Sequence, residues 1–249
     1  MREFVVVTGA DGSIGRALLD SLASNGYGVI AVDKRRPASD SPAHWLTFDL
    51  ARLANEGAAA EELRAGIDDI LANAGDARLV ALVNNAATQV VGVAASMPLT
   101  DIRLSLDVNV VAPWVLSQLL RACLAKHRGC IVNIGSIHSR LTKPGFAAYS
   151  VSKSALAGLS RALAVEWGAD IRIATIEPAA IATPMLESGF EGRSAERAEL
   201  DRAHPAGTIG QPSQVAHWVL AILADRHSFA NGITIRLDGG IGSRLHDPV

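Results

Sequence analysis

The chain has 249 residues, a formal net charge of −2 and two cysteines. A chain of this length can bury roughly 70–75% of its unfolded surface, so we expect a single domain over residues 1–249. Hydrophobic residues make up 49% of the chain and charged residues 19%, which excludes an intrinsically disordered protein. The near-neutral charge gives no reason to expect nucleic acid or an anionic membrane as a partner.

The cysteines and the N-terminal residues both favour a reducing compartment. Cys123 and Cys130 have neither disulfide-framework nor metal-ligand spacing, and we interpret them as small buried residues. The apolar run within residues 1–12 is too short for a signal peptide, and no uninterrupted apolar run of about 18 residues occurs. We therefore expect a cytoplasmic protein with no bound metal.

Short apolar, β-branched runs alternate along the chain with longer segments of helical periodicity. Strands with continuous apolar runs are buried on both faces, which is typical of a parallel sheet between helix layers. The alternation predicts an α/β fold, a Rossmann-like doubly wound parallel sheet of about seven strands with helices on both faces. In chain order we expect a strand at 4–7, a helix at 14–23, strands at 28–32 and 44–48, a helix at 57–73, a strand at 79–83, a helix at 106–126, a strand at 130–134, a helix at 149–167, a strand at 171–176, a helix at 212–224 and a strand at 233–237.

Glycine and polar residues collect directly after the predicted strands. In a doubly wound sheet, ligands bind at the carboxyl ends of the strands, so these residues indicate a ligand site at that edge. Residues 186–211 are the least regular stretch and are rich in charge, Gly and Pro. We interpret them as a mobile loop or short helices that cover a substrate. The residues that follow strands are 9–15, Asp33, 84–87, Ser136 and Pro178.

The turn between the first strand and the first helix has features of a pyrophosphate site. It reads TGADGSIG over residues 8–15, and its glycines permit a tight turn and a close approach of backbone to phosphate. The helix N-terminus offers free N–H groups and the positive end of its dipole. Ser13 is a candidate cap for this helix. The G-x-G-x-x-G spacing is absent, so a plain tight turn is the alternative.

Asp33 ends the second predicted strand, about 20 residues further on, where an acidic residue selects the cofactor. A carboxylate there accepts hydrogen bonds from the adenosine ribose hydroxyls and repels a 2′-phosphate. The basic residues Lys34, Arg35 and Arg36 follow directly and would soften that repulsion. Asp33 favours NAD over NADP, and a solvated Asp in a turn is the simpler alternative.

Tyr149 and Lys153 lie four residues apart at the start of a predicted helix, and therefore on one face. A free phenol has a pKa of about 10, and a nearby ammonium is expected to lower it. Tyr149 would then exchange a proton with a carbonyl or hydroxyl oxygen while hydride moves to or from nicotinamide. Tyr-x-x-x-Lys alone is common by chance. Ser136 makes the pattern more specific, because its hydroxyl follows a strand at the same edge and can hydrogen-bond the reacting oxygen.

Taken in order, these motifs resemble those of the short-chain dehydrogenase/reductase family, over almost the whole chain. Ser13, Ala87 and Ala179 depart from the resemblance, since each stands where the family has glycine. The matching segments are the turn at 8–15, NNAA at 84–87, Asn109 in DVN, IVNIGS at 131–136, Tyr149 to Lys153, Pro178-Ala179, Thr183 and DGG at 238–240.

The resemblance implies roles for specific residues. The catalytic set it implies is Asn109, Ser136, Tyr149 and Lys153, with Asn109 holding a water in a proton relay and Lys153 also binding the nicotinamide ribose. It further implies adenine contacts from Asp49 and Leu50, nicotinamide contacts from residues 178–183, and a homotetramer. The implied cofactor-binding residues are Gly9, Asp11, Gly12, Ser13, Ile14, Gly15, Asp33, Asp49, Leu50, Asn85, Ala86, Ala87, Tyr149, Lys153, Pro178, Ala179, Ile181 and Thr183.

Gln89 and His138 are the residues that indicate a substrate. They stand where 3-hydroxybutyrate-type dehydrogenases of the family place carboxylate-binding groups, and sugar dehydrogenases of the family also carry a His two residues after the serine. Together with Ser136 and Tyr149 they predict a polar hydroxy substrate, either a hydroxy acid or a sugar-like polyol. The alternative is a histidine that is simply hydrogen-bonded within its loop.

The predicted helix at 149–167 is apolar on more than one face, unlike a helix buried on one side. Its small residues would let a second helix approach closely, which predicts a homodimer or homotetramer. These residues are Ala155, Ala157, Gly158, Ala162 and Ala164.

The leading functional hypothesis is reversible hydride transfer between NAD and a secondary alcohol or its ketone. One alternative is an NADP-dependent carbonyl or 3-oxoacyl-carrier reductase, against which Asp33 argues. Another is a catalytically silent dinucleotide-binding protein, supported only by the glycine losses. A nucleic-acid role has neither a basic stripe nor an aromatic platform to support it.

Overall fold

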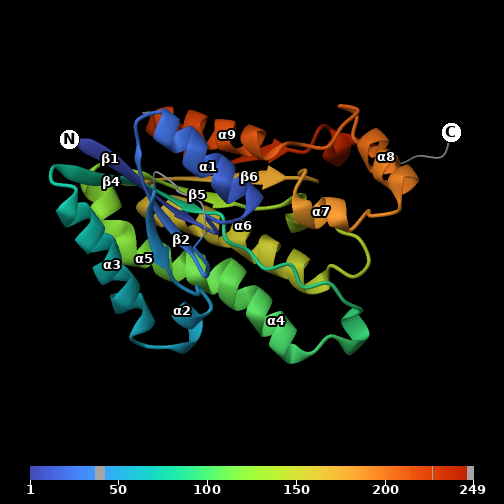
Figure 1. The fold of residues 1–249 in the computed structure, drawn as a ribbon, viewed down its shortest axis with the longest axis horizontal. Helices are drawn as coiled ribbons and strands as arrows, with labels where there is room; N and C mark the ends of the chain where they lie inside the picture. Colours follow the sequence, from blue (N-terminus) through green and yellow to red (C-terminus); the bar gives the residue numbers. More distant parts are fainter. Residues whose placement is uncertain (37–42, 226, 246–249) are drawn as a thin grey trace.

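The computed structural model describes residues 1–36, 43–225 and 227–245. Its centre is a seven-stranded parallel sheet with the order β3-β2-β1-β4-β5-β6-β7, covered by helices on both faces (Figure 1). This arrangement confirms the predicted doubly wound α/β fold. The strands are β1 (Arg2–Thr8), β2 (Gly28–Asp33), β3 (His44–Thr47), β4 (Ala77–Asn84), β5 (Cys130–Ile134), β6 (Arg172–Pro178) and β7 (Ile233–Leu237).

The strand order reverses direction at β1, because the chain adds β2 and β3 on one side and β4 to β7 on the other. Ligands of open α/β sheets bind at such a switch point, outside the carboxyl ends of the strands. The helices are α1 (Ser13–Ser24), α2 (Arg52–Asn55), α3 (Ala59–Asn73), α4 (Leu99–Leu106), α5 (Ala112–Lys126), α6 (Ala147–Trp167), α7 (Pro184–Ser188), α8 (Ser194–Ala203) and α9 (Pro212–Ala224).

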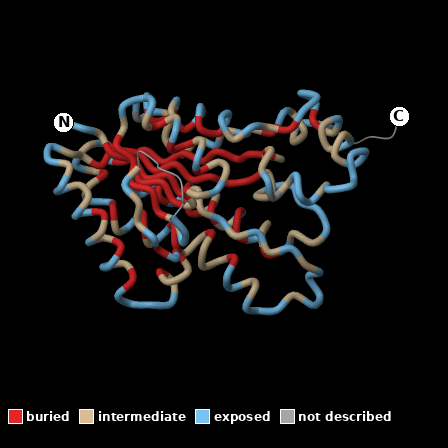
Figure 2. Tube along the Cα trace, in the orientation of Figure 1, coloured by how far each residue is buried: buried red, intermediate tan, exposed pale blue. Residues whose placement is uncertain are grey.

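Alternating residues of β1 supply two separate cores. Phe4 and Val6 pack with α3, α5 and α6, while Val5 and Val7 pack with α1 and α9. The two sets face opposite sides because successive side chains of a strand alternate. Burial on both faces accounts for the continuous apolar strands, and the most buried part of the chain is the sheet itself (Figure 2).

The helix predicted at 106–126 is longer than expected and begins at Leu99. It contains a π-helical turn at Asp107–Val111 between α4 and α5. Pro113 lies just after this turn and has no N–H to donate to the carbonyl of Asn109, four residues earlier, so regular α-helical bonding is interrupted there. The missing N–H of Pro113 thus favours an irregular turn at Asn109, a predicted site residue.

By length and mean hydropathy, Leu99–Lys126 is also apolar enough to cross a membrane. However, its residues Leu116, Leu120 and Leu124 are buried in the core against the sheet. This packing accounts for the apolar composition of the helix. The expectation of no membrane partner stays a prediction.

Residues 186–211 contain short helices, one of the two forms expected for them. Glu187 lies in α7, and α8 follows at Ser194–Ala203. The far end of this segment docks on the chain that follows β6, through a parallel bridge between Ile181 and Gly210. The segment therefore lies over the carboxyl edge of the sheet, beside β6.

Candidate active site

The β1–α1 turn is so tightly packed that Gly9 and Gly15 have no room for a side chain. A Cβ at Gly15 would lie 2.2 Å from the carbonyl oxygen of Gly9, and a Cβ at Gly9 would lie 2.7 Å from Cα of Ala86. Gly9 also has a φ of +63°, which L side chains rarely adopt. The close approach that the sequence predicts is therefore required by the turn itself.

The predicted capping role of Ser13 is wrong. Gly12 is the N-cap residue of α1, and the helix has no side-chain cap. Ser13 is already the first helical residue, one position too late for its hydroxyl to act as the cap. The first intrahelical bond runs from the Arg16 N–H to the Gly12 carbonyl, so the preceding N–H groups face the loop as an anion-binding helix end requires.

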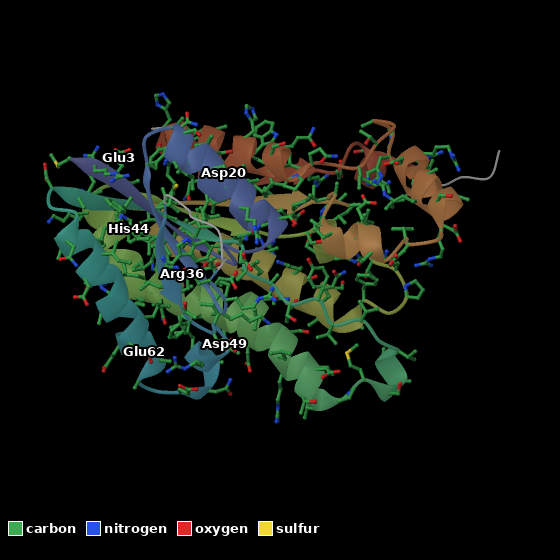
Figure 3. All side chains as sticks on the ribbon, in the orientation of Figure 1. Glu3, Asp20, Arg36, His44, Asp49 and Glu62 are labelled. Atoms are coloured by element: carbon green, nitrogen blue, oxygen red, sulfur yellow. The ribbon has the colours of Figure 1, made fainter. Side chains whose placement is uncertain are left out.

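Asp33 lies at the carboxyl end of β2, facing the same turn. One carboxylate oxygen accepts the N–H of Asp11 at 2.9 Å, and the other accepts the N–H of Arg35 at 3.2 Å. The carboxyl of Asp11 pairs with Arg16 at 2.8 Å and lies 3.9 Å from Arg35. Asp33 is thus held by the backbone at the end of β2, with exposed arginines nearby, and its contact with a ribose stays a prediction. Arg36 follows in the chain (Figure 3).

Asp49 and Leu50, the predicted adenine contacts, follow β3. Asp49 is exposed, and its carboxylate accepts the N–H of Ala51 at 3.0 Å (Figure 3). Leu50 is buried in the core. Their contact with adenine stays a prediction.

The loop after β4 is fastened to the glycine turn through Asn85. Its side-chain amide donates to the carbonyls of Thr8 and Gly9 at 2.9 and 3.0 Å. The hydroxyl of Thr8 accepts the N–H groups of Asn85 and Ala86, each at 3.0 Å. The predicted residues Asn85 and Ala86 therefore lie against the turn, whereas Ala87 is exposed.

Tyr149, Ser136 and Lys153 meet beyond the end of β5. Hydrogen bonding from the Ser136 hydroxyl acts to lower the pKa of Tyr149. Lys153 is only 2% exposed; its ammonium donates to the Ile134 carbonyl at 2.8 Å and lies 5.7 Å from the centre of the Tyr149 ring. The three groups from two elements therefore form one cluster, as predicted.

The pKa of Tyr149 does not follow the sequence prediction. Burial raises it, and the hydrogen bond with Ser136 opposes part of that rise. Burial also lowers the pKa of Lys153 to about 8, so the ammonium that was expected to stabilise phenolate is itself destabilised. In the ligand-free protein Tyr149 is held as the neutral phenol, which is the proton-donating form.

Asn109 lies in the π turn and uses its whole side chain within the protein. Its amide nitrogen donates to the Thr88 carbonyl and the Ser152 hydroxyl, each at 2.9 Å, and its oxygen accepts the Thr88 N–H at 2.8 Å. Both amide hydrogens are therefore taken, so the side chain braces the β4 loop against α6. Pro113 cannot donate an N–H to the main-chain carbonyl of Asn109, and the binding of a water by Asn109 stays a prediction.

His138 belongs to the same cluster. Its ring stacks on Phe146, with centroids 4.6 Å apart, and meets the Tyr149 ring edge-on at 5.6 Å. Its Nδ1 lies 3.1 Å from the Thr142 hydroxyl. This is the hydrogen bond within the loop that the alternative interpretation of His138 expects. Burial, and then the charge of Lys143, lower the pKa of His138, so the ring is neutral at pH 7.

The remaining predicted residues lie on the loop after β4 and on the chain after β6. Gln89 is exposed on the β4 loop. The N–H of Ala179 is bonded to the Leu237 carbonyl at 3.0 Å, and the Thr183 hydroxyl accepts the N–H of Leu186 at the start of α7. These bonds connect the end of β6 to β7 and to the segment 186–211.

Sequence reasoning missed Glu177, which directly precedes Pro178 at the end of β6. Its carboxylate is buried and bonded to Ser139 and Arg140, just after Ser136 in the chain. The available signal was an acidic residue directly after the predicted apolar strand, in the sequence RIATIEP. The predicted strand ends at residue 176, which places an acid at position 177 in the turn that follows, and only the fold shows that it is buried in β6.

The glycine turn lies at the switch point of a doubly wound sheet, which is the usual place of a dinucleotide site. A phenol, a serine and a lysine at the same edge form an acid–base site beside it. A family model described as enoyl-(acyl carrier protein) reductase matches residues 9–242. The chain belongs to the short-chain dehydrogenase/reductase family, and it is an oxidoreductase of the type that acts on alcohols and carbonyls.

Known relatives agree with this membership. The chain is 31% identical over 247 residues to an uncharacterized short-chain type dehydrogenase/reductase of Sinorhizobium fredii, covering 95% of this chain but only 43% of that protein. It is 29% identical over 240 residues to a 2,5-dichloro-2,5-cyclohexadiene-1,4-diol dehydrogenase of Sphingobium indicum, covering 95% of each.

Solved structures give the same picture. The ligand-free aldohexose dehydrogenase of Thermoplasma acidophilum has a TM-score of 0.89 and 28% identity, with 100% of this chain and 97% of that chain covered. A candidate NAD(P)-dependent gluconate 5-dehydrogenase from Beutenbergia cavernae, with NADP bound at low occupancy, has a TM-score of 0.84 and 28% identity, with 97% of each chain covered.

Proposed function

We propose that this protein transfers hydride reversibly between NAD and a secondary alcohol or its ketone. The observation that carries the proposal is the cluster of Ser136, Tyr149 and the buried Lys153, whose ammonium lies 5.7 Å from the centre of the Tyr149 ring, at the sheet edge where the glycine turn ends. The turn fits a pyrophosphate, because the start of α1 presents N–H groups to a loop in which Gly9 and Gly15 have no room for side chains. The bound nicotinamide supplies or accepts the hydride.

Each residue of the cluster then has a defined task. In reduction, Tyr149 donates its phenolic proton to the carbonyl oxygen, and Ser136 hydrogen-bonds the same oxygen. In oxidation, Tyr149 removes the hydroxyl proton. Lys153 lies beneath the phenol and stabilises negative charge on it when protonated. Asn109 holds the π turn against α6, through the Ser152 hydroxyl next to Lys153 in the chain.

The choice of NAD rests on Asp33, whose carboxylate would repel a 2′-phosphate. The exposed Arg16 and Arg35 nearby, and the relative with bound NADP, favour the alternative of an NADP-dependent carbonyl or 3-oxoacyl-carrier reductase. A catalytically silent dinucleotide-binding protein stays a minor alternative, since the Ser136–Tyr149–Lys153 cluster has no evident use in it.

Replacing Asp33 by Asn is expected to lower kcat/KM with NAD about 10-fold and to raise it with NADP by a similar factor. A charge-assisted hydrogen bond contributes about 1.5–3 kcal/mol, and asparagine keeps one acceptor for the turn while removing the repulsive charge. Steady-state rates with each cofactor measure the effect. Asp20→Asn is the matched control, because Asp20 is exposed on α1 (Figure 3). An unchanged cofactor ratio in Asp33→Asn would contradict the assignment.

We infer that the substrate carries a second hydroxyl that bonds to His138. A neutral imidazole can donate or accept a hydroxyl hydrogen bond, whereas a carboxylate would favour a charged one, so the ring favours a sugar-like polyol over a hydroxy acid. Relatives that act on a diol and on aldohexoses support this preference. The test is a panel of polyols, sugars and hydroxy acids, with the absorbance of the reduced cofactor followed for NAD and NADP in parallel. No turnover across the panel would defeat the proposal.

We propose a homodimer or homotetramer built on α6 and its neighbour. Val151 and Val165 of α6 are 57% and 87% exposed, and Leu104 and Trp114 are exposed on the adjoining helix. Exposed large apolar side chains grouped on packed helices mark an association surface. Light scattering should give a mass of two or four chains of 26.0 kDa. A single-chain mass at micromolar concentration would refute the assembly.

A further inference from the structure

Glu177 is a buried acid with no role in the proton transfer described above. Its side chain is 3% exposed. One carboxylate oxygen accepts the Ser139 hydroxyl at 2.5 Å, and the other accepts Nε of Arg140 at 3.3 Å. A buried carboxylate is costly unless it is paired and hydrogen-bonded, and this one has both kinds of partner.

Both partners of Glu177 belong to the short segment that carries the substrate-facing groups. This segment, residues 136–140, begins with Ser136, whose hydroxyl accepts the N–H of His138 at 3.2 Å. On its other side, α6 holds it through two serine hydroxyls: Ser150 donates to the His138 carbonyl and Ser154 to the Ser139 carbonyl, each at 2.8 Å.

The segment 136–140 is therefore clamped from two directions, by α6 and by the end of β6. Gly135 lets the chain approach the end of β6 closely, since a Cβ at this position would lie 3.1 Å from Cγ of Glu177. In the chain, Glu177 directly precedes Pro178, the first of the residues assigned to the nicotinamide. A buried ion pair is weak evidence for added stability, and its best-attested use is to fix one arrangement among several.

We propose that Glu177 is a positioning residue that, through Ser139 and Arg140, fixes Ser136 and His138 relative to the nicotinamide side of the site. The acid thereby sets the geometry between the reacting carbon and the cofactor without touching either. The kinetic consequence rests on the proposed function, whereas the clamp itself does not.

The kinetic test compares Glu177→Gln, Arg140→Gln and the double variant. Each single variant is expected to lower kcat about 10-fold or more, because small misplacements of reacting groups slow chemistry strongly. The double variant should lose little beyond the worse single variant, since both act on one link. KM for the cofactor should change less than threefold. The control is Glu62→Gln, an acid in an exposed ion pair with Arg52, remote from the site (Figure 3).

The isotope effect separates positioning from loss of folded protein. With an alcohol deuterated at the carbinol carbon, the primary effect on kcat should rise in the single variants, because hydride transfer becomes the slower step. Partial unfolding would reduce the amount of active enzyme without changing this ratio. A kcat within twofold of wild type and an unchanged isotope effect in both single variants would overturn the proposal.

A measurement without substrate keeps the clamp testable if no turnover is found. Burial lowers the pKa of His138, so loosening the segment should move that pKa upward, toward the usual value of about 6.5. An NMR titration of the His138 ring in Glu177→Gln and Arg140→Gln measures this, with the signal assigned by its absence in His138→Gln. Arg140 is partly exposed, so its variant is expected to fold even if Glu177→Gln does not. A His138 titration identical to wild type in both variants contradicts the clamp, and a shift without any turnover contradicts only the proposed function.

Discussion

Tyr149→Phe is expected to reduce alcohol oxidation by about 10²–10⁴-fold, which is the range that a positioned general acid–base group contributes. Phenylalanine keeps the ring and its edge-on contact with His138 but removes the atom that exchanges the proton. Burial raises the pKa of Tyr149, so its phenolate form is scarce at neutral pH. The population of this base form increases as the pH rises. The wild-type oxidation rate should therefore increase with pH. Initial rates across pH, in both enzymes, measure the effect.

The chain offers a matched control in its only other tyrosine, Tyr27. Tyr27 lies just before β2, at the amino end of the sheet and away from the cluster. Tyr27→Phe should retain the wild-type rate and its pH dependence. Binding of reduced cofactor to Tyr149→Phe, followed by fluorescence, should also stay within a fewfold of wild type. A Tyr149→Phe enzyme with threefold or less loss of turnover would refute the proton-transfer role.

Gly15→Ala is expected to destabilise the protein and to abolish cofactor binding. The added methyl would lie 2.2 Å from the Gly9 carbonyl oxygen and 2.8 Å from the Ala10 backbone, neither of which can move without opening the turn. Overpacking of this kind costs about 1–3 kcal/mol or more. For a chain of this size, about 3 kcal/mol corresponds to a fall in Tm of about 6–12 °C. Thermal unfolding and cofactor titration measure the two effects.

Gly12→Ala places the same methyl group three residues earlier in the same turn. Gly12 has a φ of −71° and a ψ of 164°, which alanine adopts readily, and the nearest atom to its Cβ is 3.4 Å away. Without cofactor, this variant should melt within about 2 °C of wild type, since surface changes rarely exceed about 0.5 kcal/mol. Equal losses in Gly12→Ala and Gly15→Ala would show that the turn does not depend on the predicted close approach.

The fold was predictable because its signals are local. Apolar strand runs, helical periodicity and the turn residues after each strand all lie within short stretches, and the seven strands appear where they were expected. The cluster of Ser136, Tyr149 and Lys153 was predictable for a related reason. In a parallel sheet, residues that follow different strands meet at one edge, so order along the chain implies proximity in space.

Three features of the site could not be predicted from the sequence, because they depend on burial and on the exact path of the backbone. The sign of the pKa shift at Tyr149 depends on how deeply the phenol and Lys153 are packed, which no spacing encodes. The capping error at Ser13 came from a one-residue uncertainty in the helix start. Glu177 was missed because its partners, Ser139 and Arg140, lie 38 and 37 residues away in the chain.

The most direct test of the central claim follows one hydrogen atom. The best alcohol from the panel, deuterated at its carbinol carbon, is incubated with oxidised cofactor and the protein. The mass of the reduced cofactor is then measured by mass spectrometry. Hydride transfer predicts one deuterium in the nicotinamide ring with wild type and with Tyr27→Phe, at a rate that collapses in Tyr149→Phe. Reduced cofactor that forms without deuterium, or at the same rate in Tyr149→Phe, would contradict the account.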